Sequence, residues 1–157
     1  MNKVMVTGGT GFIGSRLTHF LIQKGYKVRV LCRPAADVSV FGDDPVDIRE
    51  GDILDISSVE GAVKGCDYVF HLAGYARNWA RDLRTFFRVN VEGTENVLSA
   101  CRKAGVKKAV ITSTCMTLGA SSLPRREFQR RTDGFYCEYE HTKFIAEQLA
   151  PNYTASG

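Results

Sequence analysis

Thr7-Gly8-Gly9-Thr10-Gly11-Phe12-Ile13-Gly14 is the stretch that decides the fold of this chain. An apolar run at residues 4–6 comes directly before it and predicts a short strand. Residues 12–24 follow it with apolar side chains at helical spacing, and Gly25 stands where a helix C-cap belongs. A strand, a glycine turn and a helix in direct succession predict the first unit of a parallel α/β sheet.

Three glycines of this turn, Gly8, Gly11 and Gly14, have a spacing that suits a bound pyrophosphate. A glycine adopts positive φ, lets a ligand approach the backbone closely, and allows the helix N-terminus to point at negative charge. The spacing differs from the commoner G-x-G-x-x-G, although Gly9 adds a further glycine. The turn therefore predicts a dinucleotide site, against the alternative of a tight bend that holds no ligand.

The remaining chain alternates between predicted strands and predicted helices. Further strands are expected at residues 27–31, 46–50, 68–72 and 109–113, and further helices at 57–64, 83–104 and 139–149. Ser57 or Ser58 is the expected N-cap of the helix at 57–64, and Gly105 ends the long helix. Five strands alternating with helices predict a Rossmann-type, doubly wound parallel sheet with its ligand crevice at the carboxyl ends of the strands. Residues 119–138 are expected to form a long loop.

The composition is that of one ordinary globular domain, with 157 residues, 44% hydrophobic and 24% charged. No stretch is long and apolar enough to span a bilayer, and no signal peptide is evident at the N-terminus, so a cytoplasmic protein is expected. The five cysteines are scattered and predict buried, reduced thiols, with neither a disulfide framework nor a metal site. A net charge of +4 suits an anionic ligand but is too weak to indicate nucleic acid.

The end of the second predicted strand favours NADP as the cofactor, with NAD as the second choice. Sites for NAD place a carboxylate here for the ribose, whereas a 2′-phosphate prefers a guanidinium. The strand ends in Cys32-Arg33 without a carboxylate, and Arg33 could form a forked contact with that phosphate. After the third strand, Asp52 could accept a hydrogen bond from an adenine amino group, or Asp52 or Asp55 could cap the helix that follows.

Four segments together resemble an extended short-chain dehydrogenase/reductase. They are the turn Thr7 to Gly14, His71-Leu72-Ala73-Gly74, Asn90-Val91-Glu92-Gly93-Thr94, and the pair Tyr139 and Lys143. Within that superfamily the chain looks most like the NAD(P)-dependent epimerase/dehydratase group, in its dihydroflavonol-reductase-like branch. The resemblance covers essentially the whole chain and implies hydride transfer on a carbonyl or hydroxyl substrate, such as a nucleotide sugar, a flavonoid-like ketone or a sterol-like alcohol.

The resemblance implies that Thr114, Tyr139 and Lys143 are the catalytic residues. An ordinary phenol is a poor base at neutral pH, and a lysine four residues later on a helix lies on the same face, where its ammonium lowers the pKa of the phenol. Ser113 is the alternative to Thr114 as the strand-end hydroxyl. Leu118 departs from the family pattern, because many members have a tyrosine there.

The resemblance also implies a set of residues around the cofactor, and it leaves the roles of His71 and Asn90 open. His71 is expected to pack at the strand end, with catalysis as the alternative, and Asn90 either bonds near the active site or braces the fourth strand. The expected cofactor-binding residues are Gly8, Gly11, Phe12, Ile13, Gly14, Arg33, Asp52, Ile53, Leu72, Ala73, Gly74, Asn90, Thr112, Tyr139 and Lys143.

Two arginine groups invite other interpretations. Arg125, Arg126, Arg130 and Arg131 surround Phe128, but this segment lacks the docking element and stacking aromatic residues of a nucleic-acid site. A solvated loop or a contact with an anionic substrate is the preferred interpretation. A second group of arginines lies around Trp79 in the sequence and is expected to be solvated or near the substrate. It comprises Arg77, Arg81, Arg84 and Arg88.

Extended members of the resembled family run to about twice this length. We therefore expect residues 1–150 to be an NAD(P)-binding domain, residues 151–157 to be a tail, and a C-terminal substrate-binding portion to be absent. Two function classes stay open: part of an NAD(P)-dependent reductase or epimerase/dehydratase, or a non-catalytic dinucleotide-binding module or inactive fragment. The expected partner is a small-molecule substrate, with neither nucleic acid nor membrane, and a homodimer formed through the helices at 83–104 and 139–149 is left open.

Overall fold

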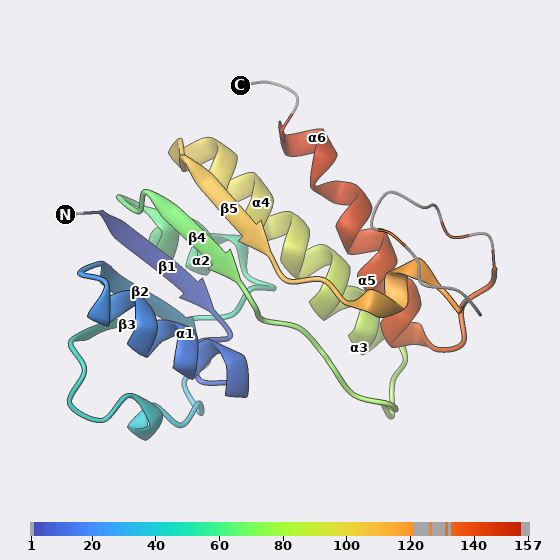
Figure 1. Cartoon of the computed structure of the whole chain (residues 1–157), viewed down its shortest axis with the longest axis horizontal. Helices are drawn as coiled ribbons and strands as arrows, with labels where there is room; N and C mark the ends of the chain where they lie inside the picture. Colours follow the sequence, from blue (N-terminus) through green and yellow to red (C-terminus); the bar gives the residue numbers. More distant parts are fainter. Residues whose placement is uncertain (1, 121–125, 127–130, 132, 155–157) are drawn as a thin grey trace.

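A five-stranded parallel sheet forms the centre of the computed structural model, which describes residues 2–120, 126, 131 and 133–154. Its strands are β1 (Lys3–Thr7), β2 (Lys27–Cys32), β3 (Val46–Glu50), β4 (Tyr68–His71) and β5 (Lys108–Ile111), in the order β3-β2-β1-β4-β5 (Figure 1). This is the predicted Rossmann-type order. The direction of winding reverses between β1 and β4, so the ligand crevice is expected at their carboxyl ends.

Helices cover both faces of the sheet, as a doubly wound fold requires. One face packs Met5 and Val69 against α2 and α4, and the other packs Val4 and Val6 against α1. The helical elements are α1 (Phe12–Gln23), η1 (Ser39–Phe41), α2 (Ile56–Val63), α3 (Arg84–Phe87), η2 (Arg88–Glu92), α4 (Gly93–Ala104), η3 (Cys115–Leu118), α5 (Glu138–Leu149) and α6 (Pro151–Thr154).

The helix ends follow the capping chemistry with one correction. Gly25 has a φ of 81°, its N–H donates to the Ile22 carbonyl at 2.8 Å, and the Tyr26 N–H donates to the Leu21 carbonyl at 3.0 Å, which is a Schellman motif. The expected N-cap of α2, Ser57 or Ser58, is wrong, and the alternative cap Asp55 is confirmed. Asp55 is the N-cap, because its carboxylate accepts from the backbone N–H of Ser57 at 3.0 Å.

The long helix predicted at residues 83–104 is composite. It comprises α3, the π-helical turn η2 and α4, whose last turn leads to Gly105 in the left-handed conformation. A π-helical turn holds an extra residue, which hydrophobic spacing alone does not reveal. Two predicted strands are also too long, since β4 ends at His71 and β5 at Ile111.

Two segments near the C-terminus refine the prediction further. Residues 151–154, expected to begin a tail, form the short helix α6. In the expected loop at 119–138, the described residues are in neither helix nor strand until α5 begins at Glu138, while Arg125, Phe128 and Arg130 lie outside the described residues. None of the described helices combines the length and the apolar character needed to cross a membrane.

The cysteines divide between the core and the surface. Cys32, Cys66 and Cys101 are buried, as expected for thiols that pack as small hydrophobic groups. The prediction is wrong for Cys115, which is exposed, and for Cys137, which is half-buried. Both lie beyond the carboxyl end of β5, Cys115 at the start of η3 and Cys137 at the N-cap of α5.

Candidate functional site

The glycine turn between β1 and α1 is built by close backbone packing. Gly8 has a φ of 70°, and a Cβ there would lie 2.6 Å from the backbone nitrogen of Ala73. A Cβ on Gly14 would overlap the Gly8 carbonyl oxygen, which accepts a hydrogen bond from the Gly11 N–H at 3.0 Å. Two of the predicted glycines are therefore required by the protein's own packing.

The first turn of α1 opens to solvent beside this loop. Phe12 is 79% exposed and Ile13 is 60% exposed, which is unusual for large apolar side chains at the start of a helix packed on a sheet. Their exposure leaves the helix N-terminus accessible to an anionic ligand. The segment where the sequence predicts the pyrophosphate is thus exposed to solvent at Gly11, Phe12 and Ile13.

The residues predicted around the adenosine lie at the carboxyl ends of β2 and β3. Arg33 is exposed immediately after β2. Asp52 is half-buried, and its carboxylate accepts from the Leu54 N–H at 3.0 Å. Ile53 is buried in the core, where its side chain fills the space that a Cβ on Gly93 would occupy. The side chain of Ile53 therefore packs in the core, whereas Arg33 is exposed to solvent.

Leu72, Ala73 and Gly74 form the backbone that runs out of β4 beside the glycine turn. The Leu72 N–H donates to the Thr7 carbonyl at 3.1 Å, which keeps the two segments together beyond the last strand residue. A Cβ on Gly74 would lie 3.3 Å from the side-chain oxygen of Asn90. Small residues in this segment therefore allow the chain itself to pack closely, in addition to any room they leave for a cofactor.

His71 is a buried, neutral side chain in a hydrogen-bond network. Thr94 donates its hydroxyl proton to the Asn90 carbonyl at 2.6 Å, so His71 must donate through Nε2 to the Thr94 oxygen at 3.0 Å. Nδ1 then accepts from the Thr7 hydroxyl at 2.7 Å. Burial, helped by the nearby Lys143 charge, lowers the pKa of His71 to about 3. These contacts agree with the expected packing role.

Asn90 joins the segment beyond β4 to α5. Its side-chain oxygen accepts from the Tyr75 N–H at 2.7 Å, and its side-chain nitrogen donates to the Thr142 hydroxyl at 3.0 Å. Thr142 in turn donates to the Glu138 carbonyl at 2.7 Å. Of the two alternatives for Asn90, these side-chain contacts agree with a bond near the candidate active site, because Thr142 lies on the helix that carries Tyr139 and Lys143 and Tyr75 lies beyond β4.

Tyr139 and Lys143 lie one turn apart on α5, as their spacing predicts. Tyr139 is half-buried in the first turn. Lys143 is buried, and its Nζ donates to the Thr112 carbonyl at 2.6 Å. Burial lowers the pKa of Lys143, with the Glu147 carboxylate opposing that effect. The described contact of Thr112, a predicted cofactor residue, is thus through its backbone.

Both candidate hydroxyls follow β5, and the structure separates their surroundings. Thr114 is half-buried at the N-cap of η3, where its Oγ1 accepts from the Met116 N–H at 3.4 Å. Ser113 donates to the Glu147 carboxylate at 2.6 Å and is exposed. Since η3 packs against α5, Thr114 sits on an element that adjoins the Tyr139 helix. Because the Ser113 hydroxyl is engaged with Glu147, Thr114 is favoured as the candidate catalytic hydroxyl.

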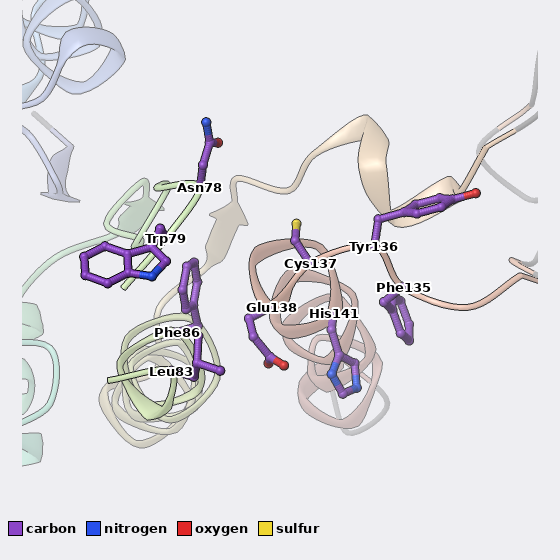
Figure 2. A pocket seen from close by; sticks show the side chains of 9 residues that line it. All are labelled: Asn78, Trp79, Leu83, Phe86, Phe135, Tyr136, Cys137, Glu138 and His141. Atoms are coloured by element: carbon purple, nitrogen blue, oxygen red, sulfur yellow. The ribbon is translucent and has the colours of Figure 1, made fainter. Parts of the chain in front are cut away.

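Sequence reasoning missed a cleft between the N-terminal ends of α3 and α5. Glu138 and His141 of α5 face Leu83 and Phe86 across it, with Trp79 at its rim (Figure 2). The cleft encloses about 470 Å³ and is lined by Asn78, Trp79, Leu83, Phe86, Phe135, Tyr136, Cys137, Glu138 and His141. Trp79 is 70% exposed and Tyr136 is 76% exposed. Aromatic residues at 79, 135 and 136 were the available signal.

The network around Arg131 was also missed. The sequence placed Arg131 in a basic cluster, yet its side chain is only 2% exposed and pairs with Glu140. Arg84, from the second arginine group, is solvated and pairs with Asp82 at 3.0 Å, as the sequence suggested. Across the described ranges, no three His, Cys, Asp or Glu side chains gather as they would to hold a metal ion.

Comparison with known proteins agrees with this geometry. The chain matches the NAD dependent epimerase/dehydratase family over residues 4–157. It is 36% identical to a 2-alkyl-3-oxoalkanoate reductase of Stenotrophomonas maltophilia over 96% of this chain and 46% of that protein. It is 35% identical to a 3 beta-hydroxysteroid dehydrogenase/Delta 5-->4-isomerase of Mycobacterium tuberculosis over 95% of this chain and 42% of that protein.

A solved structure shows the same likeness. The chain superposes on the UDP-glucose 4-epimerase of Brucella ovis in complex with NAD with a TM-score of 0.88 and 31% identity, covering 99% of this chain and 49% of the epimerase. A Rossmann sheet with a glycine turn defines the class of dinucleotide-binding proteins. Within that class, the chain belongs to the NAD dependent epimerase/dehydratase family. It spans about half the length of the curated relatives that it matches.

Proposed function

We propose that this chain is the cofactor-binding part of an NADP-preferring oxidoreductase that acts on a carbonyl or hydroxyl group, with Tyr139 as the acid and base. The observation that carries the proposal is Lys143, buried one turn from Tyr139 and oriented by the Thr112 carbonyl at 2.6 Å. A buried lysine is costly, and a packing role alone would be filled more cheaply by an apolar side chain. Its position next to the tyrosine supplies the reason for its presence.

The residues present fit a dinucleotide. The glycine turn leaves the start of α1 open beside exposed Phe12 and Ile13, and Arg33 extends into solvent beyond β2. A guanidinium at that point can form two hydrogen bonds to a ribose 2′-phosphate, which NAD lacks. When bound, the nicotinamide would donate or accept the hydride. Related proteins are described with NAD, so the choice of NADP rests on Arg33 alone.

Side chains of the protein would then transfer the proton. In the reductive direction, the Tyr139 hydroxyl donates its proton to the carbonyl oxygen as the carbonyl carbon gains the hydride, which gives an alcohol and a tyrosinate. The ammonium of Lys143 stabilises that tyrosinate. Thr114 donates a hydrogen bond to the same substrate oxygen. The reverse sequence oxidises an alcohol, so one site serves a reductase or the first step of an epimerase or dehydratase.

The cleft between α3 and α5 favours a substrate with an apolar part. Trp79, Phe86, Phe135 and Tyr136 line it, and it adjoins the turn of α5 that carries Tyr139. Two relatives carry names that refer to an oxoalkanoate and a hydroxysteroid, both with apolar frameworks. We therefore place an alkyl ketone or a sterol-like alcohol ahead of a nucleotide sugar.

The cofactor assignment is tested by equilibrium titration of the chain with NADPH and NADH. NADPH should bind more tightly, and Arg33→Ala should weaken NADPH by about 10- to 100-fold while leaving NADH unchanged, since a charged hydrogen bond is worth about 1.5–3 kcal/mol. Arg102→Ala on α4 removes the same charge away from the turn and serves as the control. Equal affinities in the unmutated protein would overturn the preference for NADP.

The assignment of Tyr139 is tested by Tyr139→Phe. Turnover should fall by about 100- to 10,000-fold, the usual contribution of a positioned acid or base, while the Kd for NADPH stays the same. Because the chain spans about half the length of its relatives, turnover is measured on the complete product of its gene. Retained turnover removes Tyr139 from the mechanism. Tight NADPH binding without any turnover instead supports a dinucleotide-binding module.

A further inference from the structure

Arg131 is a buried cation that hydrogen-bonds to two separate elements. Its Nη1 donates to the Glu140 carboxylate at 2.6 Å and to the Met116 carbonyl at 2.9 Å. Its Nε donates to the Asp133 carbonyl at 3.0 Å, and its Nη2 donates to the Gly134 carbonyl. The guanidinium carbon also lies 4.3 Å from the centre of the Phe135 ring. Such a set of partners fixes the planar group in one orientation.

Glu140 is the matching anion in the first turn of α5. Its side chain is 3% exposed, and its second oxygen accepts from the Tyr136 N–H at 2.7 Å. Burial would raise the pKa of Glu140, but the hydrogen bonds from Arg131 and the Tyr136 backbone outweigh it and hold the pKa below its ordinary value. The pair is therefore ionised, and it ties Arg131 to the first turn of α5.

The two ends of this pair touch the two elements that carry the candidate catalytic groups. Met116 belongs to η3, whose N-cap is Thr114. Thr117 of the same turn returns a hydrogen bond to the Thr114 carbonyl at 2.8 Å, so η3 and Thr114 move together. Glu140 follows Tyr139 directly in α5. Arg131 thus spans the gap between the hydroxyl-bearing turn and the phenol-bearing helix.

We propose that Arg131 and Glu140 are positioning residues that hold Tyr139 at a fixed place relative to Thr114 and Lys143. The proposal rests on the function proposed above and adds two side chains that do not touch substrate or cofactor. A buried ion pair is a poor source of stability, because removing two charges from water offsets much of their attraction. A buried ion pair beside a catalytic turn is better explained by its fixing a reactive geometry. A displacement of about 1 Å there can cost about 100-fold in rate.

The sharpest variant is Glu140→Gln, because electrostatics and positioning predict opposite results. If Glu140 acted only through its charge, its removal would leave an added positive field and lower the pKa of the Tyr139 phenol. If it holds Tyr139 near Lys143, the loosened first turn moves the phenol away from that ammonium and the pKa rises. Glutamine keeps the size and one acceptor, so the fold is preserved.

The measurement is the ultraviolet absorbance of tyrosinate against pH, with the curve of Tyr139→Phe subtracted to isolate the Tyr139 phenol. We expect the Glu140→Gln curve to shift to higher pH, turnover of the complete gene product to fall by about 100-fold, and the Kd for NADPH to change less than threefold. Lys103→Gln breaks an exposed ion pair with Glu60 and should alter none of the three.

Arg131→Lys supplies a second, independent test. Lysine keeps the charge opposite Glu140 but lacks the planar fork that reaches Glu140 and Met116 together. Turnover should therefore fall with this variant too, although the ion pair can persist. A Tyr139 curve that stays in place or shifts to lower pH in Glu140→Gln overturns the proposal, and so does full turnover in Arg131→Lys.

The two proposals fail in different ways. If Tyr139→Phe keeps its turnover, the function proposed for Tyr139 is wrong whatever the other variants do. If Tyr139→Phe is inactive while Glu140→Gln and Arg131→Lys keep full turnover, the function stands and the positioning role falls. The tyrosinate titration needs no turnover, so it decides the positioning role even in a protein that only binds its cofactor.

Discussion

The two halves of the candidate site are built by different means. On the cofactor side, backbone packs on backbone: Gly8 meets the main chain at Leu72 and Ala73, and Gly14 meets the carbonyl of Gly8. On the α5 side, side chains make the connections, with Asn90 bonded to Thr142. Arg131 and Glu140 supply a second such connection.

This difference shows how each half tolerates change. At Gly8 and Gly14 the turn admits no added atom, so failures there are steric and severe. A side-chain network loses one bond at a time, so its failures are graded and can leave the fold intact. The cofactor side should therefore respond to volume, and the α5 side to hydrogen-bonding chemistry.

Gly14→Ala should produce the largest effect. The added Cβ overlaps the Gly8 carbonyl oxygen and lies 2.8 Å from the Gly9 Cα, so the turn has to move. We expect a loss of about 3 kcal/mol in the free energy of unfolding, and NADPH binding too weak to detect by titration. Urea denaturation and equilibrium titration measure the two.

The matched control is Gly61→Ala in α2. Nothing lies within 4 Å of a Cβ at Gly61, and alanine favours the helix by about 0.5–1 kcal/mol. This variant should be at least as stable as the unmutated chain. If Gly14→Ala kept its affinity for NADPH, the steric account of the cofactor side would be wrong.

Asn90→Ala should have a smaller and more selective effect. It leaves the partly buried Tyr75 N–H without its acceptor and removes the donor to Thr142, at an expected cost of about 2 kcal/mol in the free energy of unfolding. Hydrogen exchange should speed up in the first turn of α5, while the Kd for NADPH changes less than threefold. A loss of affinity as large as that of Gly14→Ala would show that the two halves are not separable. Asn96→Ala, which removes one hydrogen bond to the Ile53 carbonyl, is the control.

Asp47→Asn should have the smallest effect, present above pH 3.8 and lost in acid. Burial opposes the charge of Asp47, yet hydrogen bonds from Lys3 and Arg29 lower its pKa to about 2 from 3.8. The folded state then binds fewer protons than the unfolded state, so the stabilisation is complete above pH 3.8 and is lost as the pH falls toward 2.

Since Asp47 is partly solvated, we expect about 1 kcal/mol of pH-dependent free energy of unfolding, measured by denaturation at several pH values. The amide that replaces the Asp47 carboxylate in the variant cannot titrate, so the stability of the variant should vary less across that window. Equal slopes for the two proteins would contradict the assignment. Neither half of the site should change, because Asp47 pairs with residues near the amino ends of β1 and β2.

The fold could be predicted from the sequence because its signals are local. The glycine turn, the apolar strands and Gly25 act within a few residues of themselves, and each appears as expected, apart from the ends of β4 and β5. Lys143 one turn after Tyr139 also follows from helix geometry. To predict the Rossmann strand order, only the right-handed crossover rule had to be added to these local signals, and the observed order agrees with it.

The rest depended on contacts between distant segments. Arg131 reads as one member of a basic cluster until the fold brings Met116 and Glu140 to it. The cap of α2 could not be narrowed to Asp55 from the sequence, because several polar residues compete there and Asp55 bonds to both serines. The cleft near Trp79 forms only when the segment before α3 meets the start of α5. No local sequence pattern encodes these contacts between distant segments.

The π-helical turn η2 gives the long helix a spare residue. A turn closed by bonds from i to i+5 holds one residue more than an α-helical turn. Deleting one residue within 88–92 would leave an ordinary α-helical turn of nearly the same rotation and rise, so the helix would close without a break. Phe86 would then stay beside Tyr75, whose ring centre lies 4.9 Å away. The extra residue could therefore be lost without changing the direction in which the helix presents Phe86 to the cleft.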